Sequence, residues 1–120
     1  MTFDQSSAEE KILLEYVIRF SVEKGRQIEF MDWINANDER LREHSRPGWT
    51  YLGTWVTVGG FGAYTGETRW SLEGYESLGG DWGDEVAQQL GGEFMGMIDT
   101  VHREANLLRS ATTASSMPGL

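Results

Sequence analysis

The sequence predicts an α+β domain whose elements follow the order β-α-β-β-α-β. Three observations carry this prediction: two amphipathic helical stretches, strand-like stretches around them, and Gly or Pro residues at the breaks. The chain has 120 residues, 39% of them hydrophobic, which is enough for one packed core. We therefore expect a single domain over residues 12–109, with mobile tails at 1–11 and 110–120.

The first half of the domain is expected to hold a strand over residues 14–22 and a helix from about 26 to 43. Alternate strand residues are apolar, as in a strand with one face buried. Gly25 ends the strand, and Pro47-Gly48 ends the helix and sets a turn. Apolar helix residues recur at 3.6-residue spacing on one broad side: Ile28, Phe30, Met31, Trp33, Ile34 and Leu41.

Two further strands are expected at residues 49–58 and 63–72. The first is rich in aromatic and β-branched residues, which favour strands. The segment Gly59-Gly-Phe-Gly62 supplies the loop of a hairpin between them.

A second helix is expected after the break at Gly79-Gly80, with Asp81 or Asp84 as its cap. Its apolar stripe comprises Val86, Leu90, Phe94, Met97 and Ile98. Three glycines weaken this helix by about 1 kcal/mol each relative to Ala. The helix must therefore be stabilised by packing against the rest of the domain, or its glycines must allow its backbone to lie close to a neighbour. Residues 101–109 fit a last strand, although they could instead prolong the helix.

This order is the split-βαβ, ferredoxin-like arrangement, an antiparallel sheet with two helices on one face. Tyr64 and Trp70 are expected on the face that meets the helices. The other face stays bare unless a partner covers it. The residues expected on this other face are Glu15, Val17, Arg19, Glu67, Arg69, Trp49, Tyr51 and Trp55. Two copies that pack these faces together would bury them and close a barrel.

The element order, the helix around Trp33 and the segment Glu67-Thr-Arg-Trp-Ser-Leu-Glu-Gly-Tyr75 resemble the dimeric α/β-barrel superfamily, which includes antibiotic-biosynthesis monooxygenase-like and NIPSNAP-like proteins. The resemblance covers about residues 12–109. It implies a homodimeric α/β barrel with a ligand cavity between sheet and helices or inside the barrel. Some members oxidise aromatic polyketides without a cofactor, and others degrade haem, cyclise or isomerise.

Haem degradation is not expected, because the chain departs from the residues that haem-degrading relatives use. Those relatives carry an Asn, a Trp and a His in the active site. Here the first strand holds no Asn, and no His lies between Tyr75 and Trp82.

Composition excludes several other classes of function. The net charge of −9 disfavours nucleic acids and anionic membranes as partners. No cysteine is present, the two histidines match no zinc template, and no nucleotide-binding motif occurs, so we expect no metal and no cofactor. No apolar run approaches the ~20 residues of a spanning helix. The first residues lack the pattern of a secretory signal, so the expected location is cytoplasmic.

The catalytic candidates are Glu67, Arg69 and His102. In the ferredoxin-like order the first and third strands are neighbours, which would bring Glu15 and Arg19 beside the first two. Arginines there could anchor an oxygen-bearing group while Glu67 accepts a proton. The alternative is an ion-pair network that only fixes a dimer interface.

His102 could serve as acid or base near one mouth of a cavity, or have a structural role. His44 is expected to complement the end of the first helix.

Four aromatic residues could stack a flat substrate, or they could simply pack in the core and interface: Tyr51, Trp55, Tyr64 and Trp70. Tyr51 and Trp55 are the better ligand candidates, and together with Arg19 and Glu15 they form the expected substrate site.

The resulting hypothesis is a homodimeric, cofactor-independent enzyme, monooxygenase-, cyclase- or isomerase-like, acting on a flat aromatic or polyketide-like small molecule. The alternative is a non-catalytic dimer that binds a ligand or a protein.

Overall fold

The structure is a computed structural model that describes residues 13–59 and 62–111. The predicted tails fall outside these residues except for Ser110 and Ala111, and so does the centre of the predicted glycine loop, Gly60-Phe61. The elements are β1 (Leu14–Val22), α2 (Gln27–Glu43), β2 (Trp49–Val56), β3 (Gly66–Leu72), the 3₁₀ helix η1 (Tyr75–Leu78), α3 (Glu85–Met97) and β4 (Ile98–Arg109).

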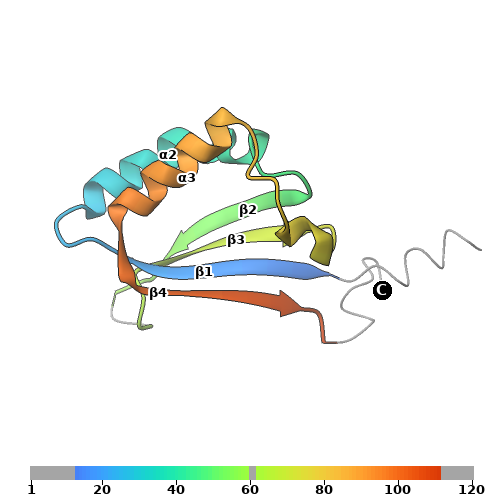
Figure 1. The fold of residues 1–120 in the computed structure, drawn as a ribbon. Helices are drawn as coiled ribbons and strands as arrows, with labels where there is room; N and C mark the ends of the chain where they lie inside the picture. Colours follow the sequence, from blue (N-terminus) through green and yellow to red (C-terminus); the bar gives the residue numbers. More distant parts are fainter. Residues whose placement is uncertain (1–12, 60–61, 112–120) are drawn as a thin grey trace, which may run out of the picture.

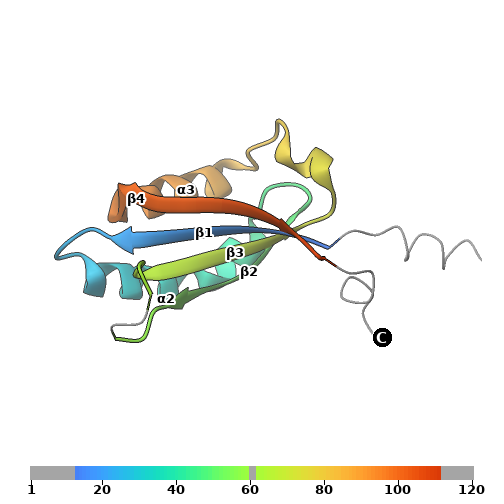
Figure 2. The same cartoon turned by 90° about the horizontal axis from the view of Figure 1, so that it is seen from below.

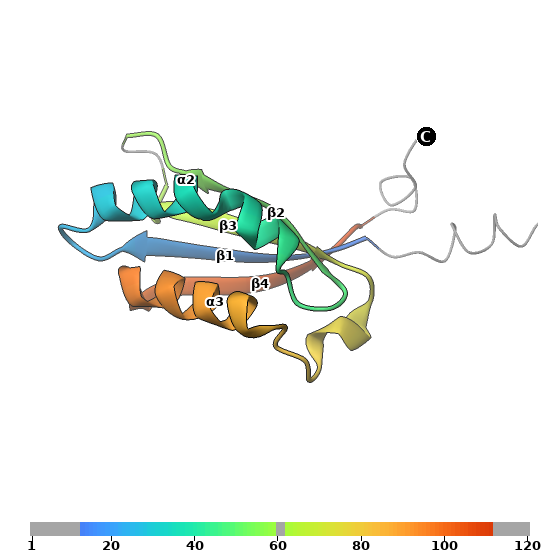
Figure 3. The same cartoon turned by 90° about the horizontal axis from the view of Figure 1, so that it is seen from above.

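The predicted βαββαβ fold is confirmed (Figure 1). The strands form one antiparallel sheet in the order β2-β3-β1-β4. Both helices cover the same face: α2 runs along β2 and β3, and α3 runs along β4 (Figure 3). Seen from below, the opposite face of the sheet carries no helix formed by residues 13–59 or 62–111 (Figure 2). We call this the open face, and the side under α2 and α3 the helix face.

The core packs tightly at one end of the space between sheet and helices. The ring of Phe20, fully buried on β1, lies 5.4 Å from that of Phe30 on α2 and 5.0 Å from that of Phe94 on α3. Val22, Met97 and Ile98 complete this cluster. Rings at these separations gain edge-to-face attraction in addition to buried area. These contacts fix the spacing of both helices above the sheet.

Helix α2 buries fewer of its apolar residues against the sheet than their spacing predicted. Phe30 is buried, but Ile28 and Met31 are 79% and 40% exposed. Asn37 is buried instead, and its side chain donates to the Trp33 carbonyl at 2.9 Å, so no polar atom is left unpaired there.

Helix α3 begins at the second of its two predicted caps. The Asp84 carboxylate accepts a hydrogen bond of 2.8 Å from the Ala87 backbone N–H. Ile98 pairs with Val22 and begins β4, three residues before the predicted start of the last strand. Residues 101–109 therefore form a strand, and the alternative that they prolong the helix is wrong.

A β-bulge in β2 reverses the predicted direction of two aromatic side chains. The register with β3 shifts between Tyr51 and Gly53, where Gly53 has a φ of +142°. A bulge of one residue moves the side chains before it to the other face. Trp49 and Tyr51 therefore lie on the helix face, which corrects the prediction, whereas Trp55 lies on the open face opposite Glu67.

None of the helices in the described part of the chain has the length and hydropathy to cross a membrane.

Candidate functional site

The four charged residues predicted to meet on the open face do meet there. The Glu67 carboxylate accepts from Arg69 Nε at 2.6 Å and from Arg19 Nε at 3.0 Å. Arg69 Nη1 also donates to Glu15 at 3.0 Å. The contacts follow from the strand register, which sets Arg19 directly opposite Glu67 and Val17 opposite Arg69. The open face thus carries a connected network of two cations and two anions.

The network holds Glu67 ionised and makes it a weak base. Partial burial raises the pKa of Glu67, but the hydrogen bonds and charges of Arg69 and Arg19 outweigh it and lower the pKa below its ordinary value. Each carboxylate oxygen already accepts from a guanidinium. A proton acceptor should instead have a pKa near the working pH. This geometry therefore favours the structural alternative for Glu67 over the catalytic one.

The lowered pKa predicts how the stability of the protein depends on pH. The contribution of Glu67 is fully present above its unfolded-state pKa, near 4.5, and is lost as pH falls through the lower folded-state pKa. Denaturant unfolding of wild type and Glu67→Gln should therefore differ most at neutral pH, and the difference should shrink in acid. A difference that stays constant between neutral and acid pH would contradict this assignment.

His102 lies on β4, at the edge of the same face. Its Nδ1 is 2.7 Å from the hydroxyl of Ser21, and its ring stacks on Tyr64 with centroids 4.5 Å apart. The Tyr64 hydroxyl donates to Glu104 at 3.2 Å. Tyr64 therefore lies on the open face, contrary to the prediction, because β3 begins only at Gly66 and Tyr64 belongs to the loop before it.

A shallow hollow of about 300 Å³ adjoins this part of the open face. Three residues of the predicted site line it, Arg19, Trp55 and Glu67. Tyr64 lines it as well. Glu15, Arg69 and His102 lie outside its lining. Tyr51 lies on the opposite face of the sheet, 2% exposed.

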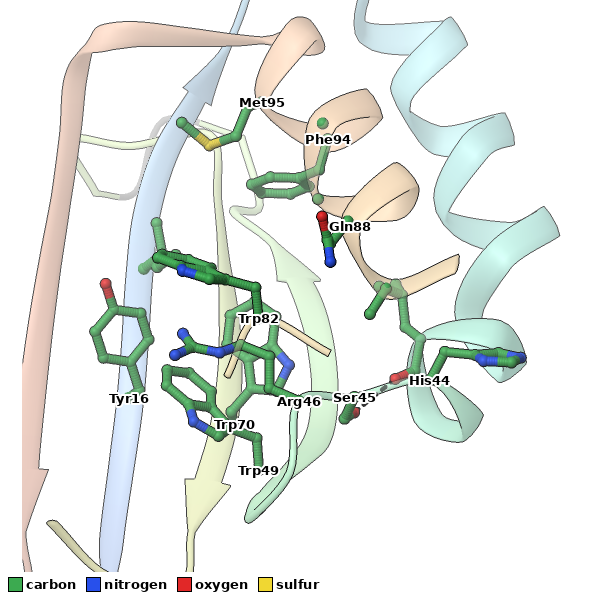
Figure 4. A pocket seen from close by; sticks show the side chains of 15 residues that line it. Tyr16, His44, Ser45, Arg46, Trp49, Trp70, Trp82, Gln88, Phe94 and Met95 are labelled. Carbon is green, nitrogen blue, oxygen red and sulfur yellow. Dashed lines mark hydrogen bonds between the residues drawn. The ribbon is translucent and has the colours of Figure 1, made fainter. Parts of the chain in front are cut away.

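A larger cavity, which sequence reasoning missed, lies between the sheet and the helices (Figure 4). Its volume is about 520 Å³. We call it the aromatic cavity. It is lined by Tyr16, Ile18, Leu41, His44, Ser45, Arg46, Trp49, Trp70, Trp82, Ala87, Gln88, Gly91, Gly92, Phe94 and Met95.

The glycines of α3 leave this cavity open. A Cβ atom built on Gly91 or Gly92 would meet no other atom within 4 Å. Of the two alternatives for this helix, a close approach of the backbone at Gly91 and Gly92 is therefore not found, which leaves stabilisation by packing. Both glycines line the cavity, and a side chain at either position would start in open space. The glycine pair inside an amphipathic helix was the signal in the sequence that could have revealed the cavity.

Aromatic rings from three strands form the floor of the cavity. The ring of Trp49 lies 5.1 Å from that of Tyr16 and 6.0 Å from that of Trp70, both at steep angles. The Trp49 indole N–H donates to the Ser77 carbonyl of η1 at 2.7 Å, which fixes its orientation. Tyr51 packs behind Trp70, with its hydroxyl 2.6 Å from that of Thr54, and burial raises its pKa. The floor is thus a fixed, mostly apolar surface that offers ring faces and ring edges to a bound aromatic molecule.

Arg46 and Trp82 line one side of the cavity, where Trp82 is 67% exposed. The Arg46 guanidinium lies 4.5 Å from the Trp49 ring centre and 4.4 Å from that of Trp82, a cation held between two indoles. Its Nε donates to the Asp81 carbonyl at 2.9 Å.

His44, at the end of α2, pairs with the Asp84 carboxylate at 2.9 Å. This hydrogen bond and that of the Ala87 N–H lower the pKa of Asp84. Figure 4 shows the His44 ring directed away from the tryptophans. Its side chain therefore ties α2 to the start of α3, in place of the predicted role at the end of α2 alone.

In residues 13–59 and 62–111, no group of three or more His, Asp or Glu side chains is placed to hold a metal ion.

Comparisons with known proteins return little. No protein-family model matches the chain, and no curated protein matches it. Among solved structures, the crystal structure of At3g17210 from Arabidopsis thaliana is similar, with 16% sequence identity and a TM-score of 0.47. The match covers 82% of this chain and 94% of that one. A likeness at this level transfers neither an activity nor an assembly.

Proposed function

We propose that this protein is a homodimeric α/β-barrel protein that binds a flat, largely apolar small molecule in the aromatic cavity. The observation that carries the proposal is the cavity of about 520 Å³, lined by aromatic rings and by the small residues Gly91 and Gly92. Its size falls within the roughly 300–1,000 Å³ of small-molecule sites.

Binding is proposed rather than turnover. The hypothesis of a cofactor-independent enzyme used Glu67 as proton acceptor, and this carboxylate is engaged by two arginines. The walls of the aromatic cavity are mainly rings and aliphatic groups, with Arg46, His44 and Gln88 among its few polar members. Such walls favour the binding of a ligand through stacking and shape over the catalysis of a reaction.

The homodimer is proposed from the open face. A charged network with side chains 22–41% exposed lies around Val17, which is fully buried, and Trp55 on the same face is 51% exposed. A sheet face that carries ion pairs and a large aromatic side chain suits an interface better than bulk water. If two copies packed their open faces together around a two-fold axis, each would cover the charged network of the other.

Titration with 2-naphthamide, a flat and neutral probe, tests the binding proposal. Isothermal titration calorimetry should give saturable binding of one probe per chain, in the sub-millimolar range typical of so small a ligand. Cyclohexanecarboxamide, which is not planar, should bind markedly more weakly. Absence of saturable binding by 2-naphthamide would refute the proposed function. Sedimentation velocity on the same sample should give the mass of a dimer.

A further inference from the structure

We infer that the natural ligand of the aromatic cavity is a planar aromatic acid whose carboxylate pairs with Arg46. This inference rests on the proposed function and adds the charge class of the ligand. It starts from the Arg46 guanidinium, which is the only permanently charged group among the described residues that line the cavity.

The cavity differs sharply in charge from the rest of the protein. The chain has 19 acidic and 10 basic residues, not counting histidine. Not one Asp or Glu is among the residues that line the cavity. A carboxylate that enters would therefore meet a local cation and no anion in the wall, although the protein as a whole repels it weakly at long range.

The two acidic residues that flank Trp82 in sequence, Asp81 and Asp84, are engaged elsewhere. Asp81 accepts from the Gly83 backbone N–H at 2.8 Å through its carboxylate. Asp84 caps α3 and pairs with His44. No ion pair in the described part of the chain includes Arg46. Four other arginines of the described residues do pair with carboxylates, in six contacts: Arg19, Arg26, Arg42 and Arg69.

The indoles of Trp49 and Trp82 orient the guanidinium for a ligand. With the indoles of Trp49 and Trp82 packed against it and Nε bound to the Asp81 carbonyl, the Arg46 guanidinium offers its remaining N–H groups in its own plane. Figure 4 shows the guanidinium directed across the cavity toward Tyr16, next to the ring of Trp82. A planar acid lying on the aromatic floor would present its carboxylate to these N–H groups in the same plane, the geometry of a bidentate pair.

The test compares two probes of nearly the same shape, 2-naphthoate and neutral 2-naphthamide, by calorimetry at neutral pH. The wild-type protein should bind the acid about tenfold more tightly than the amide, the gain of a charge-assisted pair. In Arg46→Met this preference should disappear while affinity for the amide stays within a few-fold. Arg46→Lys, which keeps the charge without the planar fork, should give an intermediate preference. Arg109→Met, on exposed β4, should behave as wild type.

The outcomes separate this inference from the proposed function. If wild type binds the amide as tightly as the acid, the inference is overturned and the cavity remains a site for neutral flat molecules. If neither probe binds, the proposed function itself fails. If Arg46→Met keeps the preference for the acid, another group anchors the carboxylate and the assignment to Arg46 is wrong. Circular dichroism of each variant verifies that the fold is retained.

Discussion

Gly91→Phe is expected to abolish binding of 2-naphthamide, with a loss of at least about fiftyfold in affinity, in a protein that stays folded. We expect the new ring to occupy the aromatic cavity, because Gly91 lines it and a Cβ there would meet no atom within 4 Å. Phe also has a better helix propensity than Gly, so α3 should gain a few tenths of a kcal/mol. Loss of binding would then coincide with unchanged or raised stability.

Gly96→Phe provides the matched control. It is the same substitution in the same helix, and a Cβ there also meets no atom within 4 Å, but Gly96 does not line the cavity. Calorimetry should find wild-type affinity for this variant. Equal losses in both variants would mean that binding depends on the helix in general, and unchanged binding in Gly91→Phe would place the ligand elsewhere.

Glu67→Gln is expected to weaken the homodimer by at least about tenfold. The substitution keeps the size of the side chain but removes the charge between Arg19 and Arg69, whose Nε atoms both donate to it. Two guanidinium groups would then face each other at the proposed interface without their shared anion. Sedimentation velocity over a range of concentrations should show monomers at concentrations where wild type is a dimer.

Glu39→Gln controls for the loss of one negative charge, since Glu39 lies on the exposed side of α2. Its dissociation constant should match that of wild type. If Glu67→Gln dimerises as tightly as wild type, the ion-pair network does not hold the subunits together. Wild-type monomers at micromolar concentration would contradict the dimer altogether.

The fold could be predicted from the sequence because each element carries its own local signal. β1 was predicted at its observed bounds by alternation alone, and the pairing of Arg19 with Glu67 followed from the strand order. The direction of Trp49 and Tyr51 could not be predicted in this way. The direction of these side chains depends on one extra residue in β2. The alternation of residues in the sequence does not reveal such a bulge, because a bulge is defined by the pairing with the partner strand.

The aromatic cavity escaped prediction for a different reason. Its walls come from all layers of the fold, and Trp49, Trp70 and Trp82 each resemble ordinary core or loop residues when taken singly. Gly91 and Gly92 look only like weak points of a helix in the sequence. The structure is needed to show that they line the same cavity as the tryptophan rings. Tyr64 illustrates the converse, since it was assigned to the helix face by extending the strand period into a loop.

The most direct test of the central account is a ¹⁵N–¹H spectrum of the indole N–H groups during titration with 2-naphthamide. The chain has five tryptophans, which the structure distributes over distinct surroundings. Trp49, Trp70 and Trp82 line the aromatic cavity, Trp55 lines the hollow on the open face, and Trp33 donates to Glu93 between the helices. Single Trp→Phe variants assign the signals.

The account predicts that the indole signals of Trp49, Trp70 and Trp82 shift with saturation while those of Trp33 and Trp55 stay in place. A shift confined to Trp55 would contradict it and move the ligand to the open face.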